Sequence, residues 1–232
     1  KGGIPYAAEA VESGRINFSF ASLPLISGNK TIFKNPEINI ELKFKGIRFA
    51  EGNEQGSLLE TTVIKKIRLS SSLQVAQRLL YKSGPFRNTG SLPPVHDTET
   101  SYTIVWSLVN SSNDVSDVTV RANLPTYVKW LGQVSPMDES ISYNPLGGEV
   151  VWNVGNVKAG SGINNPAKEV AFQVSLMPSL TQIGTYPNMI SDALVSGKDD
   201  FTSANVSYSR KSITIQLTGD AGVTGQELGG VR

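Results

Sequence analysis

Apolar and polar residues alternate one by one through most of this chain, and helical periodicity is nearly absent. The clearest stretch is residues 38–45, where every even-numbered residue is apolar and every odd-numbered residue is polar or charged. Strict alternation of this kind places successive side chains on opposite faces of a β-strand. The stretch therefore predicts an antiparallel strand with one buried face and one face in water.

Three further segments of the first half fit the same reading. Residues 16–20 alternate in the same way and are predicted to pair with the strand at 38–45. Residues 61–69 and 73–81 are predicted to complete the set. The last of these leaves an alternative open, because Val75, Leu79 and Leu80 also fit one face of a short helix.

A stretch rich in proline and glycine divides the chain. Residues 82–94 contain three Pro and two Gly, and proline fixes φ and lacks a backbone N–H. We place a domain boundary here. The predicted organisation is a β-sandwich domain over 1–84, a linker over 85–95, a second β-sandwich domain over 96–217, and a Gly-rich extended tail over 218–232.

The second half contains a series of short alternating segments separated by turn residues. They cover residues 102–110, 118–124, 128–131, 149–154, 170–176, 189–195 and 204–217. Repeated short strands with turns between them are typical of two packed antiparallel sheets. The predicted fold is all-β, with two immunoglobulin-like sandwich domains in tandem.

Hydropathy and charge argue against a membrane-spanning protein and against a nucleic-acid-binding protein. The longest apolar runs are a few residues, far below the roughly 20 that a membrane-spanning helix needs. There are 21 basic and 20 acidic residues, a formal charge of +1. A nucleic-acid-binding face needs clustered basic residues, so we expect neither nucleic acid nor a membrane span.

The chain contains no cysteine and one histidine, His96. This composition excludes disulfides, thiolate nucleophiles, Cys-ligated zinc and sites built from several histidines. His96 lies in a Pro-rich connector, where a catalytic role is not expected. No nucleotide-binding loop is present. We therefore predict a protein that is not an enzyme and has no cofactor.

Residues 102–177 carry an ordered set of features. A strand ending at Asn110 is followed by a polar turn at 111–114, then by Leu124-Pro125, and then by Trp152-Asn153-Val154-Gly155 with Ala159-Gly160 close behind. This order resembles the conserved-repeat, immunoglobulin-like domain of bacterial and archaeal surface proteins known as DUF11, over about residues 95–217. Asn123 departs from the family pattern, which often has Asp just before Leu-Pro.

The resemblance implies a place and an architecture, and it carries no catalytic residues. Domains of this family occur as tandem modules in adhesins, stalks and envelope layers. The implied location is extracellular, at the cell surface. The implied partners are other copies of the chain or neighbouring surface proteins, such as those of an S-layer or a filament.

Calcium is the one metal ion for which the sequence offers candidate ligands. The candidates are Asp114 and Asp117 in a predicted hairpin, and the adjacent pair Asp199 and Asp200 after Gly197-Lys198. Hard cations take several oxygen ligands from acidic loops. No complete calcium-binding loop is present, so acids that are simply solvated in turns remain the alternative.

Two functions from different classes are compatible with these features. The first is a structural surface subunit that assembles through edge strands and by exchange of the extended tail. The second is an adhesin module that binds a glycan or a host protein through exposed aromatic residues, with Tyr127, Tyr143 and Tyr186 as candidates. Buried aromatic residues and an ordered tail would favour the first function.

Overall fold

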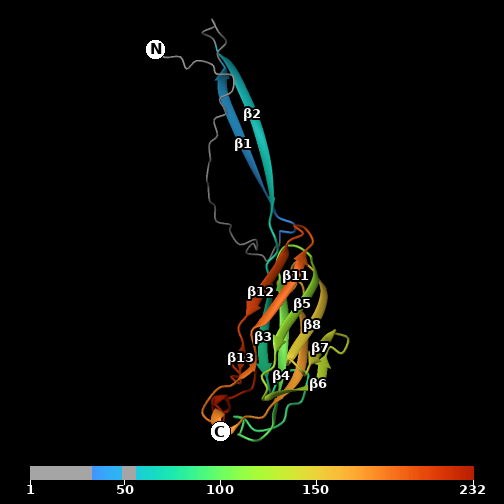
Figure 1. Ribbon diagram of the computed structural model, residues 1–232, viewed down its shortest axis with the longest axis vertical. Helices are drawn as coiled ribbons and strands as arrows, with labels where there is room; N and C mark the ends of the chain where they lie inside the picture. Colours follow the sequence, from blue (N-terminus) through green and yellow to red (C-terminus); the bar gives the residue numbers. More distant parts are fainter. Residues whose placement is uncertain (1–32, 49–55) are drawn as a thin grey trace.

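The structure is a computed structural model that describes residues 33–48 and 56–232 (Figure 1). Thirteen strands and two short 3₁₀ helices make up the described residues, so none of their helices could cross a membrane. The strands are β1 (Glu37–Arg48), β2 (Ser57–Arg68), β3 (Leu73–Leu80), β4 (Thr100–Asn110), β5 (Val115–Asn123), β6 (Val128–Ser135), β7 (Ile141–Asn144), β8 (Glu149–Val157), β9 (Lys168–Leu176), β10 (Asn188–Ile190), β11 (Ala193–Asp199), β12 (Asn205–Arg210) and β13 (Ile213–Thr214), and the helices are η1 (Leu180–Gln182) and η2 (Gly225–Leu228).

Two antiparallel sheets form a β-sandwich from residue 69 onward. One sheet has the order β12-β11-β5-β8-β7, and the other has the order β3-β4-β9-β6. A small third sheet pairs β10 with β13. The all-β fold and the antiparallel sandwich that the alternating pattern predicts are confirmed.

Large apolar side chains from both sheets fill the space between them. Trp106 and Phe172 meet edge to face with their ring centroids 5.1 Å apart, and Trp152 comes from the opposite sheet. All three side chains are fully buried. The indole N–H groups are also satisfied, because Trp106 donates to Gln77 at 2.9 Å and Trp152 donates to Glu139 at 2.8 Å. This core is the main source of stability in the sandwich.

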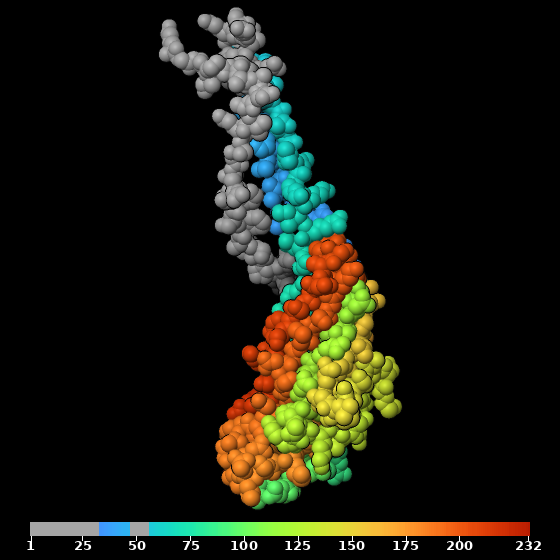
Figure 2. Space-filling model, in the orientation of Figure 1, coloured from blue at the N-terminus to red at the C-terminus, as the bar shows by residue number. Residues whose placement is uncertain are grey.

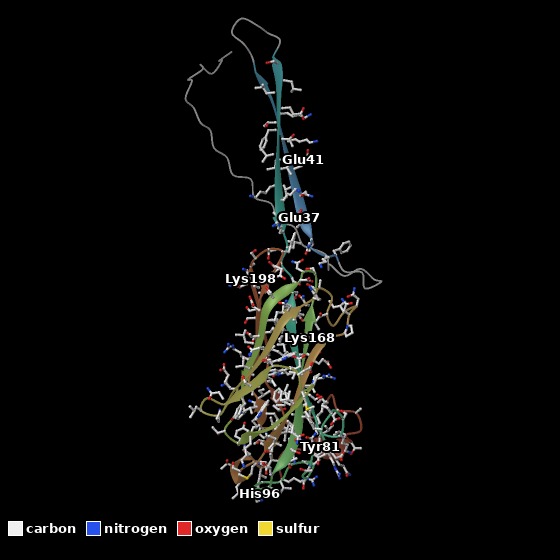
Figure 3. The ribbon with its side chains drawn as sticks, turned by 90° about the vertical axis from the view of Figure 1, so that its right-hand side faces the viewer. Glu37, Glu41, Tyr81, His96, Lys168 and Lys198 are labelled. Atoms are coloured by element: carbon white, nitrogen blue, oxygen red, sulfur yellow. The ribbon has the colours of Figure 1, made fainter. Side chains whose placement is uncertain are left out.

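Strands β1 and β2 form a two-stranded antiparallel ribbon that projects from one end of the sandwich (Figure 1). Residues that face each other across the pair lie on the same side of the ribbon. One side, called here the apolar face, contains Ile38, Ile40, Leu42, Phe44, Leu59, Val63 and Ile67. The other side contains most of the charged residues, including Glu37 and Glu41 (Figure 3).

The structure differs from the predicted division of the chain at residues 85–95. Strand β3, assigned by sequence to an N-terminal sandwich, pairs with β4 over eight residues from Leu73 opposite Asn110 to Leu80 opposite Thr103. The described residues of 1–84 therefore form the ribbon and the first strand of the sandwich. The Pro- and Gly-rich stretch connects two paired strands and folds over their end, where Tyr81 donates to the carbonyl of Gly90 at 2.6 Å.

The last residues also differ from the prediction of an extended tail. Residues 218–232 include η2 and pack against the end of the sandwich that lies away from the ribbon. Val231 is buried, and its N–H donates to the carbonyl of Thr185 at 3.1 Å. A Cβ on Gly230 would lie 2.8 Å from that carbonyl oxygen. Glycine at this position therefore permits close packing of the tail on the backbone of Thr185.

Three finer predictions have different outcomes. Residues 73–80 form a strand, so the helical alternative for them is wrong. Strand β7 was not predicted, because its four residues give too short a pattern. The predicted strand at residues 16–20 lies outside the described residues.

The placement of β3 in the sandwich predicts the effect of shortening Leu79, a core residue that is 4% exposed. We expect Leu79→Ala to lower the free energy of unfolding by about 2–5 kcal/mol, as large-to-small core substitutions do. All three Trp residues lie between 106 and 152, so tryptophan fluorescence during denaturation by urea reports on the sandwich. Val63→Ala on the ribbon is the control, and we expect it to leave this transition unchanged. An unchanged transition in Leu79→Ala would contradict the placement of β3.

Candidate functional site

The candidate acidic residues gather where the ribbon joins the sandwich, called here the ribbon end. Asp199 ends β11, and its buried carboxylate accepts four N–H groups. One oxygen accepts from the backbone of Ser71 at 2.7 Å and from the side chain of Asn113 at 2.8 Å. The other accepts from the backbone of Phe201 at 2.9 Å and of Thr202 at 2.8 Å. Asp199 thereby joins the start of β3, the β4–β5 turn and the β11–β12 turn.

These contacts set the charge state of Asp199. Burial by itself raises the pKa of the carboxyl, but the hydrogen bonds from Ser71, Thr202 and Asn113 outweigh it and hold the pKa below its usual range. Asp199 is therefore ionised at neutral pH. Its charge is compensated by aligned N–H groups instead of by a basic side chain.

Asp114 and Asp200 lie at the same end of the sandwich, and Asp117 follows in β5. The N–H of Asp200 donates to the carbonyl of Asp114 at 3.0 Å. The Asp114 carboxylate forms ion pairs with Lys158 at 2.9 Å and with Lys34 at 3.6 Å. Asp117 is exposed and occupies the left-handed backbone region with φ of 52°. The structure thus brings Asp114, Asp199 and Asp200 near one another, but it gives each a different set of partners.

The acidic residues at the ribbon end offer calcium few free ligands, because the carboxylates of Asp199 and Asp114 already bind N–H groups and lysines. Calcium takes six to eight oxygen ligands. Within residues 33–48 and 56–232, no three His, Asp or Glu side chains are grouped so that they could hold a metal ion. The only buried side-chain oxygen of the cluster without a hydrogen-bond donor in the described region is Oδ1 of Asn113. Calcium at Asp114, Asp117, Asp199 or Asp200 therefore stays a prediction.

A second buried aspartate, which the sequence analysis did not single out, holds the opposite end of β3. One carboxylate oxygen of Asp220 accepts the N–H groups of Tyr81 and Lys82 at 2.5 and 2.7 Å, and the other accepts from the backbone and hydroxyl of Ser83. Burial raises its pKa, but these hydrogen bonds outweigh burial and lower it. We call this the tail end of the sandwich. Tyr81 and His96 mark it in Figure 3, and Lys198 marks the ribbon end.

An ion pair supports the same attachment of the tail. Lys82 lies 2.7 Å from Glu227, which also accepts hydrogen bonds from the N–H and hydroxyl of Thr224. Bonding to Lys82 and then to Thr224 lowers the pKa of Glu227 to about 2. The tail is held by contacts between residues near the start of the sandwich sequence and residues near its end. No local motif could have identified these contacts.

The aromatic candidates for glycan binding occupy different environments. Tyr143 stacks on Trp130 with ring centroids 5.6 Å apart, and Trp130 also packs on Phe172 at 5.0 Å. Tyr127 is partly buried against the core. Tyr186 is exposed and lies in the connection between β9 and β10. The three candidates therefore do not form one platform.

His96 lies in the connector at the tail end. Its N–H donates to the carbonyl of Arg232 at 2.8 Å, and its ring nitrogen Nδ1 lies 3.0 Å from the carboxylate of Asp97. Both side chains are substantially exposed. This agrees with its interpretation as a connector residue.

Comparisons with known proteins give little further information. No family model matches the chain, and no curated protein matches it. Membership of the DUF11 family therefore stays a prediction. Among solved structures, a GH20 exo-β-N-acetylglucosaminidase from Vibrio harveyi is 10% identical, with a TM-score of 0.35, and the match covers 58% of this chain and 17% of that one.

Two major pilin subunits also match. SpaD from Corynebacterium diphtheriae is 12% identical, with a TM-score of 0.37, and the match covers 61% of this chain and 35% of that one. BcpA from Bacillus cereus is 9% identical, with a TM-score of 0.36, and the match covers 68% and 53%. The chain thus matches about half or less of each of these proteins, and the likenesses are too low to support a function.

The four hydrogen bonds of Asp199 predict a large effect of neutralising it. We expect Asp199→Asn to lower the free energy of unfolding by about 2–4 kcal/mol, because an amide nitrogen cannot accept the N–H groups that one oxygen now accepts. Asp200→Asn is the matched control, since Asp200 is exposed, and we expect a change within about 0.5 kcal/mol. Equal effects would contradict the structural role of Asp199.

Repeating the wild-type measurement with calcium and with a chelator tests the calcium prediction, because bound calcium would raise the unfolding midpoint.

The lowered pKa values predict how stability depends on pH. Since the pKa values of Asp199 and Asp220 are lower in the folded state than in the unfolded chain, the unfolded state binds more protons in acid. We expect the stabilisation to be complete above the usual Asp pKa of about 4, and to be lost as pH falls through the folded-state values. Urea denaturation at a series of pH values measures this. The loss should be smaller in Asp199→Asn, and an identical pH profile would contradict the assignment.

Proposed function

We propose that this chain is a structural module of the cell exterior that joins its neighbours through exposed β-structure and performs no catalysis. The observation that carries the proposal is the attachment of the ribbon to the sandwich. Strand β2 continues into β3 after four residues, 69–72, and β3 pairs with β4 over its whole length. The ribbon is therefore an extension of a sandwich strand.

The ends of β3 are both fixed by buried carboxylates. Asp199 accepts the N–H of Ser71 just before the strand, and Asp220 accepts those of Tyr81 and Lys82 just after it. Tension applied along the ribbon would act on β3 parallel to its length. The hydrogen bonds between β3 and β4 would then share the load instead of opening one at a time. This is the arrangement expected of a module that transmits force between neighbours.

Other contacts stiffen the base of the ribbon. The guanidinium of Arg68 lies 4.9 Å from the centre of the Phe201 ring, and the N–H of Leu69 donates to the carbonyl of Pro36 at 3.0 Å. The N–H of Asn35 donates to the carbonyl of Ser112 at 3.3 Å. These contacts join the residues at the base of both ribbon strands to each other and to the β4–β5 and β11–β12 turns of the sandwich. They favour a ribbon that is held rigidly on the sandwich, and they disfavour a flexible hinge between the two.

The environment of the aromatic residues also supports the structural function. Trp106 and Trp152 are fully buried, and Trp130 packs against both Tyr143 and Phe172. The tail is ordered against its own sandwich, so exchange of residues 218–232 between molecules is not part of the proposal. An adhesin remains the second candidate, because Tyr143 lines a surface hollow of about 520 Å³.

The test is the location of the protein on intact cells of its source. We expect antibodies against the sandwich to label unpermeabilised cells, and protease added outside to remove the label. Label that appears only after permeabilisation would contradict an exterior function. Binding of the purified chain to a glycan array, lost in Tyr143→Ala, would favour the adhesin.

A further inference from the structure

The apolar face of the ribbon has the composition of an interior surface, yet it is exposed. Phe44 is 48% exposed and Val63 is 50% exposed. Over residues 38–44 and 59–67, Lys65 is the only charged residue on this face, and Arg48 follows on the same side at the far end of the ribbon. Two-stranded ribbons are marginally stable in water unless their apolar side is packed against something, and large exposed apolar patches mark interaction sites.

A second exposed apolar patch lies at the tail end, in the connection between β9 and β10. Four large apolar side chains occur within ten residues there, and we call them the tail-end patch: Met177, Leu180, Ile183 and Tyr186. Leu180 is 60% exposed and Ile183 is 49% exposed. The two apolar surfaces are at opposite ends of the long axis of the molecule (Figures 1 and 2).

The connection that carries the tail-end patch is held in one conformation. The N–H of Gly184 donates to the carbonyl of Val231 at 2.8 Å, and the N–H of Ser179 donates to the side chain of Gln182 at 3.0 Å. The tail residues that pack here therefore fix the shape of the patch. A preorganised surface loses less entropy when a partner binds.

The charges of the two parts are complementary. Strands β1 and β2 contain six basic and three acidic residues, whereas residues 69–232 contain eleven basic and thirteen acidic residues. Two ribbons would repel each other, while a ribbon and a sandwich attract. The exposed acid Asp97 lies beside the tail-end patch, since its N–H donates to the carbonyl of Pro178 at 2.7 Å.

From these observations we infer that the apolar face of the ribbon of one molecule docks on the tail-end patch of a second copy of this chain. This contact joins two different surfaces, and such contacts generate open filaments unless the rotation closes a ring. The inference deepens the proposed function, because it names the neighbour and the surfaces that meet.

The area of the apolar face limits the strength of the contact between two molecules. Twelve residues per strand at about 3.4 Å give a face about 40 Å long and about 10 Å wide, or about 400 Å². A stable interface buries about 800 Å² on each partner. Each contact is therefore weak, and assembly should appear only as the protein concentration rises.

Two variants that each block one surface provide the test. Val63→Glu places a charge on the apolar face of the ribbon, and Leu180→Glu places one on the tail-end patch. The matched controls are Thr62→Glu, on the opposite side of the ribbon, and Leu194→Glu, on an exposed part of β11. Tryptophan fluorescence during urea denaturation checks that all four variants are folded.

Sedimentation velocity at rising concentration is the measurement. We expect the wild type and both controls to form growing species and each blocked variant alone to stay monomeric. An equal mixture of Val63→Glu and Leu180→Glu should give a dimer that does not grow further, because each retains the surface that the other lacks. This pattern distinguishes a head-to-tail contact from every symmetric one.

Each other result would overturn the inference. Dimers of Leu180→Glu alone would show that two ribbons pair with each other. Assembly of both blocked variants like the wild type would show that other surfaces are used. If the wild type is monomeric and the Val63→Cys variant reacts slowly with a maleimide, then another part of the same chain covers the apolar face of the ribbon. Label on intact cells together with a monomeric chain would overturn only this inference, and missing surface label would contradict the proposed function instead.

Discussion

The hydrogen bonds that Asp199 and Asp220 accept at the two ends of β3 determine how the parts of this molecule are joined. Each carboxylate is buried and accepts N–H groups from residues that are far from it in the sequence. A buried carboxylate that is not bonded in this way would be costly, so its position is strongly specified. Because β3 follows directly from the ribbon, fixing β3 also fixes the direction in which the ribbon leaves the sandwich.

The contrast between the two parts of the molecule follows from what covers each apolar surface. In the sandwich, side chains from two sheets bury one another around Trp106, Trp152 and Phe172. In the ribbon, a pair of strands with an equally apolar face has no second sheet among the described residues. The same alternation of residues therefore produces a core in one place and an exposed apolar face in the other.

The tail illustrates how one end of the sandwich is shaped by residues distant in sequence. Asp220 and Glu227 hold residues 218–232 to the segment after β3, and Val231 in turn holds the connection after β9. The conformation of the tail-end patch thus depends on contacts made by the last fifteen residues. A structural function and an apolar contact at this end both require that order.

Local patterns in the sequence were enough to locate most of the strands. Period-2 alternation predicted the positions of β1, β4, β5, β8 and β9 because a strand exposes alternate residues to the core, and this is a local property. The absence of cysteine and the single histidine likewise limited the chemistry without reference to any fold. Asp199 was noted as a candidate only because acidic residues in turns are recognisable locally.

The arrangement of the strands in each sheet and the contacts of each acidic residue follow from the packing of the whole fold. Pairing of β3 with β4 spans a Pro- and Gly-rich connection that locally resembles a domain boundary. The partners of Asp199 and Asp220 come from segments up to about 140 residues away, as in the 139-residue separation of Asp220 and Tyr81. Local patterns carry no information on such contacts, because pairing depends on the packing of all the strands at once. For the same reason, the even-numbered residues of 38–45 predicted a buried face, whereas the structure leaves Leu42 and Phe44 exposed and Ile38 and Ile40 half-buried.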